Sequence, residues 1–191
     1  MTKGGMPMMV LFARLADSFR QRKSVRTLAA SAMLLSLGVV LDYFGSIYVT
    51  PELKISLSFL AIASAGYLFG PASAMLCGGL LDVLMWVIKP AGAYFPGYTL
   101  SGILGGLIYA VCLYRQKGRR LLILGAVSKL LVNLIVNILI NTLWSMIFTG
   151  KGYLALLSVR IPKNLILWPV ESALLIVVLL FLSRNRQKIL R

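Results

Sequence analysis

Histidine is absent from this chain of 191 residues, and carboxylates are scarce, with five Asp and Glu against 20 Lys and Arg. The lack of histidine removes the commonest general base and the commonest metal ligand, so acid–base catalysis and metal chemistry are disfavoured. The two cysteines, Cys77 and Cys112, form no CxxC pair and lie within apolar runs. We expect them to pack as small core residues rather than to act as redox groups, and we expect no cofactor.

A phosphate-binding P-loop is also missing. The nearest match to its pattern is Gly150-Lys151, with Ser145 where the first glycine should stand and Gly152 where Ser or Thr should follow. The chain is therefore not expected to bind and hydrolyse ATP by itself.

Apolar residues are what the chain has in excess. They make up 59% of it, and its mean hydropathy is +0.88, whereas soluble domains are about 45 to 50% apolar. We therefore predict an all-α membrane protein whose six transmembrane helices form one bundle. The predicted spans cover residues 26–47, 53–70, 72–89, 97–114, 121–148 and 157–183.

The net charge of +15 would suggest nucleic-acid binding in a soluble protein. Here the cations lie mostly between apolar runs, where they indicate topology. Fourteen of them fall on one side of a six-span arrangement, which predicts a multi-pass protein of the bacterial plasma membrane with both termini cytoplasmic. They are Lys3, Arg14, Arg20, Arg22, Lys23, Arg26, Arg115, Lys117, Arg119, Arg120, Arg184, Arg186, Lys188 and Arg191.

The chain divides into two parts on this view. Residues 1–24 form a cytoplasmic amino-terminal segment in which an apolar stretch is followed by charges, a pattern that fits a short helix on the membrane surface or a disordered tail. Residues 25–191 form the six-helix domain.

Polar residues recur every four positions in the fifth predicted span, at Lys129, Asn133, Asn137 and Asn141. This spacing places them on one slowly turning face of a helix, which must point into the bundle because lipid would not solvate it. Interhelical hydrogen bonding suits Asn133. Asn141 lies nearest the outer side and is a candidate ligand contact.

The sixth predicted span carries Arg160, Lys163, Asn164 and Glu171 on a shared face, interrupted by two prolines at 162 and 169. A charge inside a bilayer costs about 2.5 to 3.5 kcal/mol, so it requires a partner or a ligand. The chain has too few carboxylates to pair every cation, which favours an anionic ligand. A small buried charge network among Asp82, Lys129 and Glu171 is the expectation for the inner half.

The outer half combines positive charge with aromatic side chains. Five cations, at 54, 89, 151, 160 and 163, face the carboxylates of Asp42 and Glu52 and leave +3 there. Such a surface attracts an anion, and aromatic side chains bind flat rings. Packing and an interfacial aromatic belt remain alternatives for the aromatics. The candidate binding residues are Trp86, Lys89, Tyr94, Phe95, Asn141, Arg160, Lys163, Asn164 and Tyr67.

Small residues stand at helical spacing in three predicted spans, and such pairs allow helices to approach closely. Ala32 and Ser36 form the pair on the first span, which could offer its outer surface to another subunit. The other pairs are Gly66 with Gly70 and Gly102 with Gly106.

Several short motifs taken together resemble the substrate-binding S-components of energy-coupling factor (ECF) vitamin transporters. They are Leu53-Lys-Ile-Ser-Leu-Ser-Phe-Leu60, Phe69-Gly-Pro71, Gly78-Gly-Leu-Leu-Asp82, Tyr94-Phe-Pro-Gly-Tyr-Thr-Leu100 and Gly105-Gly-Leu-Ile-Tyr109. The small pair of the first span corresponds to the family's Ala-xxx-Ala motif, with serine as a departure in its second place.

Within this family, Arg160-Ile-Pro-Lys163-Asn164 followed by Pro169 resembles the folate-specific members. The resemblance implies a six-helix bundle that binds folate from outside. It also implies docking, through Ala32 and Ser36, on a transmembrane coupling subunit driven by two ATPase subunits, and toppling in the membrane to carry the vitamin inward. Arg160 and Lys163 would suit the glutamate carboxylates, and the aromatics with Asn141 or Asn164 the rings. The reverse assignment stays open.

Three other functions are alternatives to this one. Pantothenate or another anionic vitamin is the alternative ligand, for which the aromatic residues would be packing. A membrane-embedded lipid-modifying enzyme would need a nucleophile, base or metal cluster that the composition does not favour, and a stand-alone channel would need a selectivity filter that no segment resembles.

Overall fold

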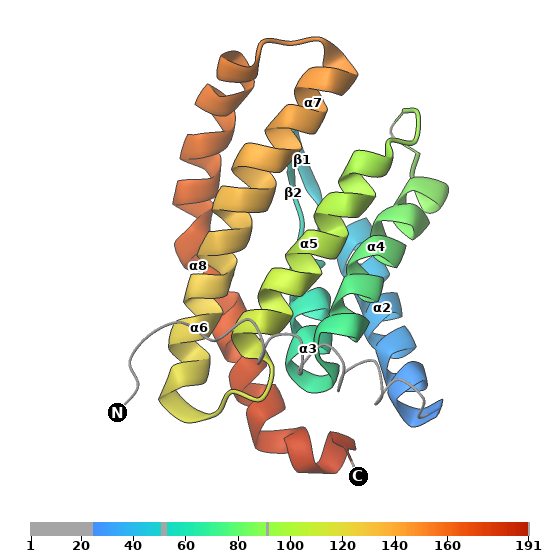
Figure 1. Ribbon diagram of the computed structural model, residues 1–191, viewed down its shortest axis with the longest axis vertical. Coiled ribbons are helices and arrows are strands. Elements are labelled where there is room, and N and C mark those ends of the chain that lie inside the picture. Colours follow the sequence, from blue (N-terminus) through green and yellow to red (C-terminus); the bar gives the residue numbers. More distant parts are fainter. Residues whose placement is uncertain (1–24, 51–52, 91, 191) are drawn as a thin grey trace, which may run out of the picture.

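A computed structural model describes residues 25–50, 53–90 and 92–190 of the chain, which fold into an elongated bundle of helices (Figure 1). The predicted amino-terminal segment, residues 1–24, lies outside the described residues. In chain order the elements are α2 (Val25–Gly45), β1 (Ile47–Thr50), β2 (Leu53–Ile55), α3 (Phe59–Phe69), α4 (Pro71–Ile88), α5 (Pro96–Leu113), α6 (Gly118–Leu131), η1 (Val132–Ile140), α7 (Asn141–Thr149) and α8 (Tyr153–Leu190).

The predicted all-α membrane fold is confirmed. Among the described residues, five helical segments are long and apolar enough to cross a membrane: Val25–Gly45, Pro71–Ile88, Pro96–Leu113, Gly118–Thr149 and Tyr153–Arg186. The sixth, α3, has 11 residues and is therefore about 16 Å long, against about 30 Å for the hydrocarbon core.

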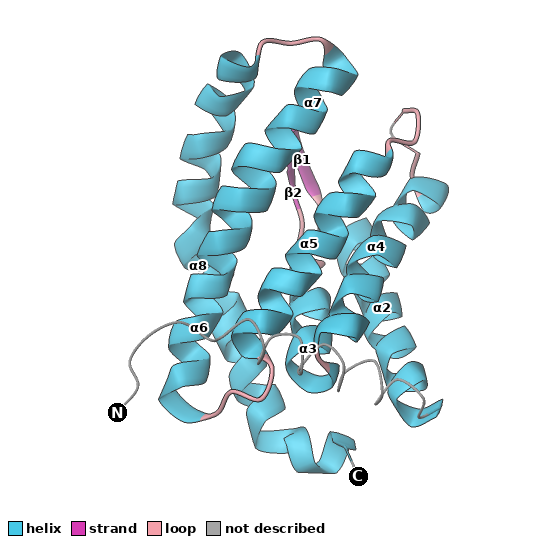
Figure 2. Cartoon of the chain, in the orientation of Figure 1, coloured by secondary structure: helices cyan, strands magenta, loops and turns pink. Residues whose placement is uncertain are grey.

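The prediction of a helix over 53–70 was wrong in its first third. The strands Ile47–Thr50 and Leu53–Ile55 form instead an antiparallel hairpin, in which Ile47 pairs with Ile55 (Figure 2). The buried carboxylate of Asp42, in the last turn of α2, accepts hydrogen bonds from the hydroxyls of Ser46 and Ser56. The base of the hairpin is thus tied to α2, and a helix begins only after Ser58.

The tight turn predicted at Gly70-Pro71 is confirmed. Gly70 has φ of +86°, a conformation that a side chain disfavours, and its N–H donates to Gly66 O at 3.1 Å to close α3. Pro71 occupies the first turn of α4, where its missing N–H is not needed, and Pro96 does the same for α5. These residues fix where two of the helices begin.

The fifth predicted span is one rod built from α6, η1 and α7 without a break (Figure 1). Its middle third, Val132–Ile140, is a π-helix. Segments of this kind are rare and occur frequently at functional sites.

Polar and apolar side chains are distributed as lipid exposure requires. Lys129 and Asn133 are 3% and 1% exposed inside the bundle, whereas Phe44 and Ile166 are 80% and 73% exposed on its surface. The interior also contains apolar residues from α3, α5, α6 and α8, including Tyr67, Tyr109, Leu113, Leu121, Leu175 and Leu179.

The two ends of the bundle differ in their connections (Figure 1). The beginning of α2, the end of α8 and the α5–α6 connection lie at one end, whereas the hairpin and the α4–α5 and α7–α8 connections lie toward the other. Four of the predicted cytoplasmic cations, at 115, 117, 119 and 120, belong to the first end. We refer to it as the inner end and to its opposite as the outer end.

Candidate functional site

The guanidinium of Arg160 lies in the interior toward the outer end, where α8 packs on α7 and η1. Its Nη2 donates to Ser145 Oγ at 2.5 Å and its Nη1 to the carbonyl oxygen of Asn137 at 3.3 Å. The residue is only 8% exposed. A cation at this depth needs such oxygen partners, and a guanidinium also forms charge-assisted hydrogen bonds with an anionic or carbonyl oxygen.

Ser145 joins Arg160 to a third helix. The Tyr98 hydroxyl of α5 lies 3.0 Å from Ser145 Oγ, which itself is buried. Sequence reasoning missed Ser145, although a signal was present. The polar repeat of every four residues that runs from 129 to 141 reaches Ser145 when it is extended by one step.

An aromatic cluster lies next to this junction, formed by Phe95 and Tyr98 of the α5 start together with Trp144 and Phe148 of α7. The Phe95 ring is the centre of the cluster, with centroids 5.8 Å from Tyr98, 5.6 Å from Trp144 and 6.2 Å from Phe148. Gly97 makes this packing possible, because a Cβ there would lie 2.3 Å from Phe95 Cε1 and 2.7 Å from Trp144 Cδ2. The cluster offers π surface at the outer end.

A second group, more exposed, is formed by Trp86, Lys89 and Tyr94 around the α4–α5 connection. The Trp86 indole donates to Gly92 O at 3.0 Å and its ring lies 5.3 Å from that of Tyr94. The Lys89 ammonium stands 5.8 Å from the centre of the Tyr43 ring. The contacts of Trp86 fasten the connection to α4, and the contact of Lys89 joins the end of α4 to α2.

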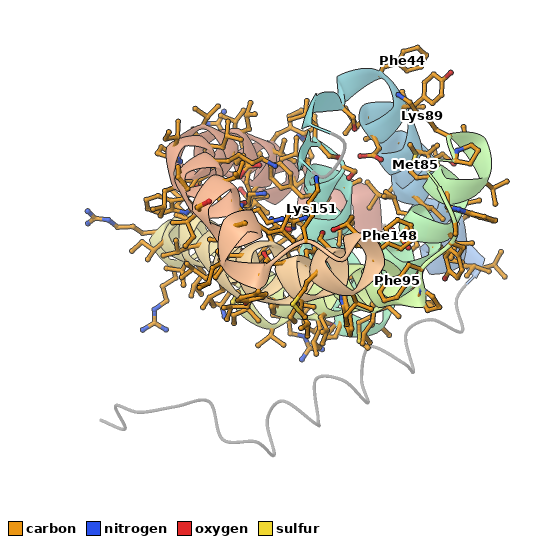
Figure 3. All side chains as sticks on the ribbon, turned by 90° about the horizontal axis from the view of Figure 1, so that it is seen from above. Phe44, Met85, Lys89, Phe95, Phe148 and Lys151 are labelled. Carbon is orange, nitrogen blue, oxygen red and sulfur yellow. The ribbon has the colours of Figure 1, made fainter. Side chains whose placement is uncertain are left out.

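The outer end is seen from above in Figure 3. Lys89 and Phe44 lie along one edge, Phe95 and Phe148 along another, with Met85 between them, and Lys151 lies away from Lys89. Lys89 and Lys151 are both exposed cations at this end, and Lys151 precedes α8, whereas Arg160 lies seven residues into that helix.

The asparagine stripe is confirmed as an internal hydrogen-bonded ladder. Asn141 Nδ2 donates to Asn137 Oδ1 at 3.4 Å, and Asn137 Nδ2 donates to Asn133 Oδ1 at 3.0 Å. Asn133 Nδ2 donates in turn to Glu171 Oε2 at 3.1 Å, and the Lys129 ammonium lies 3.2 Å from the same oxygen. The predicted network therefore forms between Lys129 and Glu171.

Asp82 does not join that network. Its carboxylate accepts a hydrogen bond of 2.6 Å from the Thr99 hydroxyl, which lies 2.7 Å from the hydroxyl of Tyr94. The reason is geometric. Asp82 faces α5, near the start of that helix, whereas Lys129 and Glu171 face each other across α6 and α8.

The remaining candidates divide between the site and the rest of the bundle. Asn164 is buried one turn beyond Arg160 and donates to its carbonyl at 2.8 Å, and Lys163 is half-buried beside it. The prediction that Tyr67 lies in the outer half is wrong. It lies near the inner end because α3 runs inward from the hairpin, and its ring is 5.2 Å from the guanidinium of Arg186.

Ala32 and Ser36 both lie on the exposed face of α2. The Ser36 hydroxyl donates to Ala32 O at 3.0 Å, within its own helix. This face of α2 therefore remains accessible from the membrane.

Comparison with known proteins adds three kinds of similarity. Residues 26–179 match the family model described as "ECF transporter, substrate-specific component". The chain is 37% identical over 152 residues to the folate transporter FolT of Clostridium novyi (strain NT), covering 78% of this chain and 86% of the relative. It is 29% identical over 146 residues to FolT of Leuconostoc mesenteroides subsp. mesenteroides, covering 73% and 77%.

Two solved structures share the arrangement of helices. A crystal structure of FolT bound with folic acid superposes with a TM-score of 0.72 at 28% sequence identity, covering 80% of this chain and 91% of that one. The S component of a bacterial ECF transporter superposes with a TM-score of 0.64 at 19% identity, covering 86% and 97%, and this second likeness concerns the fold alone.

Proposed function

Because this chain belongs to the substrate-specific components of ECF transporters, we propose that it is the folate-binding membrane subunit of such an importer. It binds folate from the outer side and passes it inward through a coupling subunit and two ATPase subunits, without hydrolysing ATP itself. The observation that supports this most directly is the buried Arg160 guanidinium beside the aromatic cluster at the outer end. Two relatives that are folate transporters, at 37% and 29% identity, agree with it.

The two ends of folate fit two levels of the site. Arg160 lies seven residues into α8, about 10 Å from the start of the helix, and shares the Ser145 hydroxyl with the hydroxyl of Tyr98, a member of the aromatic cluster. A flat pterin with a carbonyl oxygen suits this level, because stacking and a charge-assisted hydrogen bond are both provided. The glutamate carboxylates suit the rim, where Lys89 and Lys151 are exposed and the anions keep most of their hydration.

Titration with two vitamins tests the proposal. The detergent-solubilised chain should bind folate with one site per chain and give no heat with pantothenate, which has no ring for the aromatic cluster to contact. Isothermal titration calorimetry measures both. Clear heat with pantothenate and none with folate would show that the aromatic cluster is packing and that the ligand assignment is wrong.

The exposed face of α2 is the proposed docking surface for the coupling subunit. Ala32→Trp or Ser36→Trp should stop folate uptake by cells while leaving folate binding by the purified chain unchanged, because a large ring prevents close helix approach. Leu37→Trp is the matched control, since Leu37 is exposed on the same helix and lies about 100° around it from Ser36 and about 140° from Ala32. Loss of folate binding by the folded Ala32→Trp or Ser36→Trp chain would contradict a docking role for that residue.

A further inference from the structure

The asparagine ladder has a direction, and its inner end sets that direction. An asparagine amide is asymmetric, with a donating nitrogen and an accepting oxygen. The carboxylate of Glu171, paired with the Lys129 ammonium at 3.2 Å, can only accept. Asn133 must therefore turn its nitrogen toward Glu171, at 3.1 Å, which leaves its oxygen for the next step.

The remaining steps of the ladder repeat this choice. Asn133 Oδ1 accepts from Asn137 Nδ2 at 3.0 Å, and Asn137 Oδ1 accepts from Asn141 Nδ2 at 3.4 Å. Reversing any single amide would place two oxygens or two NH2 groups against each other. All three amides consequently point the same way, over about two helical turns.

The outer end of the ladder is an acceptor without a donor. Asn141 Oδ1 is buried and has no hydrogen-bond partner among the described residues. A buried polar atom left unpaired is rare and calls for a functional explanation. Arg160 donates to the carbonyl of Asn137 and to Ser145 Oγ, so its guanidinium spans the turn that carries Asn141. The unpaired oxygen is thereby placed at the site already described.

We infer that Glu171 is a remote specificity-determining residue: through the ladder it makes Asn141 present an oxygen, which accepts a ring N–H of the ligand. The inference rests on the proposed folate-binding function and names the ligand chemistry that the site selects, a planar heterocycle with an amino or lactam N–H. Arg160 supplies the complementary donor for the ring carbonyl oxygen. Asn141 touches the ligand, and Glu171, Asn133 and Asn137 are positioning residues.

Two folate analogues test the donor directly. In the 2-desamino analogue a hydrogen replaces the amino group, and in the 3-deaza analogue a C–H replaces the lactam N–H, so neither change adds bulk. Wild type should bind at least one of them roughly 10- to 100-fold more weakly than folate. In Asn141→Leu, the ratio of folate affinity to analogue affinity should fall close to one. Asn141→Asp keeps an acceptor and should retain the wild-type ratio.

The remote role of Glu171 is tested by cutting the ladder where it does not touch the ligand. Asn137→Leu removes the middle rung, and Lys129→Met combined with Glu171→Gln replaces the ion pair by neutral groups of similar size. In both variants the Asn141 amide can turn over, so the ratio of folate to analogue affinity should fall. A purely structural role would weaken folate and analogue by the same factor and leave the ratio unchanged.

The outcomes separate this inference from the function on which it rests. Absence of folate binding by wild type would overturn the proposed function. Folate binding by wild type with equal affinity for both analogues would show that a water or nothing pairs with Asn141, and would overturn the inference alone. A ratio of folate to analogue affinity that is unchanged in Asn141→Leu would also overturn the inference. If one ladder variant fails to fold, the other still decides whether Glu171 acts through the amides.

Discussion

Arg160→Ala should weaken folate binding by roughly 10- to 150-fold, which corresponds to about 1.5 to 3 kcal/mol for one charge-assisted hydrogen bond. The bundle should remain folded. The contacts of the guanidinium with Ser145 Oγ and Asn137 O are hydrogen bonds to uncharged groups, whose loss costs the fold only modestly. Isothermal titration of wild type and variant measures the loss, and circular dichroism confirms the fold.

Pteroic acid, which lacks the glutamate, assigns Arg160 to one end of the ligand. The variant should lose as much affinity for pteroic acid as for folate, because Arg160 lies beside the aromatic cluster and below the rim. Arg160→Lys should also bind more weakly than wild type, since an ammonium cannot reproduce the fork of a guanidinium. A loss seen with folate but not with pteroic acid would place Arg160 on the glutamate tail and reverse the assignment.

Lys151→Ala provides the matched contrast at the rim. Lys151 is exposed just before α8, where a contact with a carboxylate is screened by water and contributes about 0.2 to 1 kcal/mol. Folate affinity should therefore fall by no more than about 5-fold, and pteroic acid affinity should not change.

The polar interior was predictable from sequence because its signal is local. Lys129, Asn133, Asn137 and Asn141 repeat every four residues in an apolar run, and the structure places them on one internal face. The π-helix at Val132–Ile140 was not predictable from the same repeat. A spacing of four lies between the α-helical period of 3.6 and the longer period of a π-helix, so it is compatible with both.

The hairpin and the charge partners were harder because they depend on contacts between distant residues. Residues 53–59 alternate apolar and polar side chains, which favours a short strand, but they lead directly into an apolar run that fits a helix, so the boundary between the two is not marked. What distinguishes them here is the bonding of Ser56 to Asp42, 14 residues earlier in the chain. Similarly, position along the predicted spans groups Asp82 with Lys129 and Glu171, whereas its contact with Thr99 depends on the packing of α4 on α5.

The packing of α4 on α5 depends on glycines at the places where the two helices cross. A Cβ on Gly106 of α5 would lie 2.3 Å from Ala74 O of α4, and one on Gly78 of α4 would lie 2.1 Å from Gly102 O of α5. The two backbones are therefore in direct contact at both crossings. The pair Gly102 and Gly106, expected from its spacing to permit close helix approach, is confirmed in that role.

Gly106→Ala and Gly78→Ala should each destabilise the folded chain by about 1 to 3 kcal/mol or more. The added methyl group meets backbone atoms, which unlike a flexible side chain cannot move aside unless the helices separate. Gly105→Ala is the matched control in the same helix, because the atom nearest its Cβ would be Val132 Cγ1 at 4.0 Å. That change should be neutral or slightly stabilising, since alanine is the better helix former.

Thermal unfolding in detergent, followed by tryptophan fluorescence, compares the three variants. Equal stability of Gly105→Ala and Gly106→Ala would show that α4 and α5 do not meet as closely as these distances require. Because Asp82, Thr99 and Tyr94 hold the α4–α5 connection over the same helix pair, folate affinity should fall with stability in Gly78→Ala and Gly106→Ala and stay unchanged in the control.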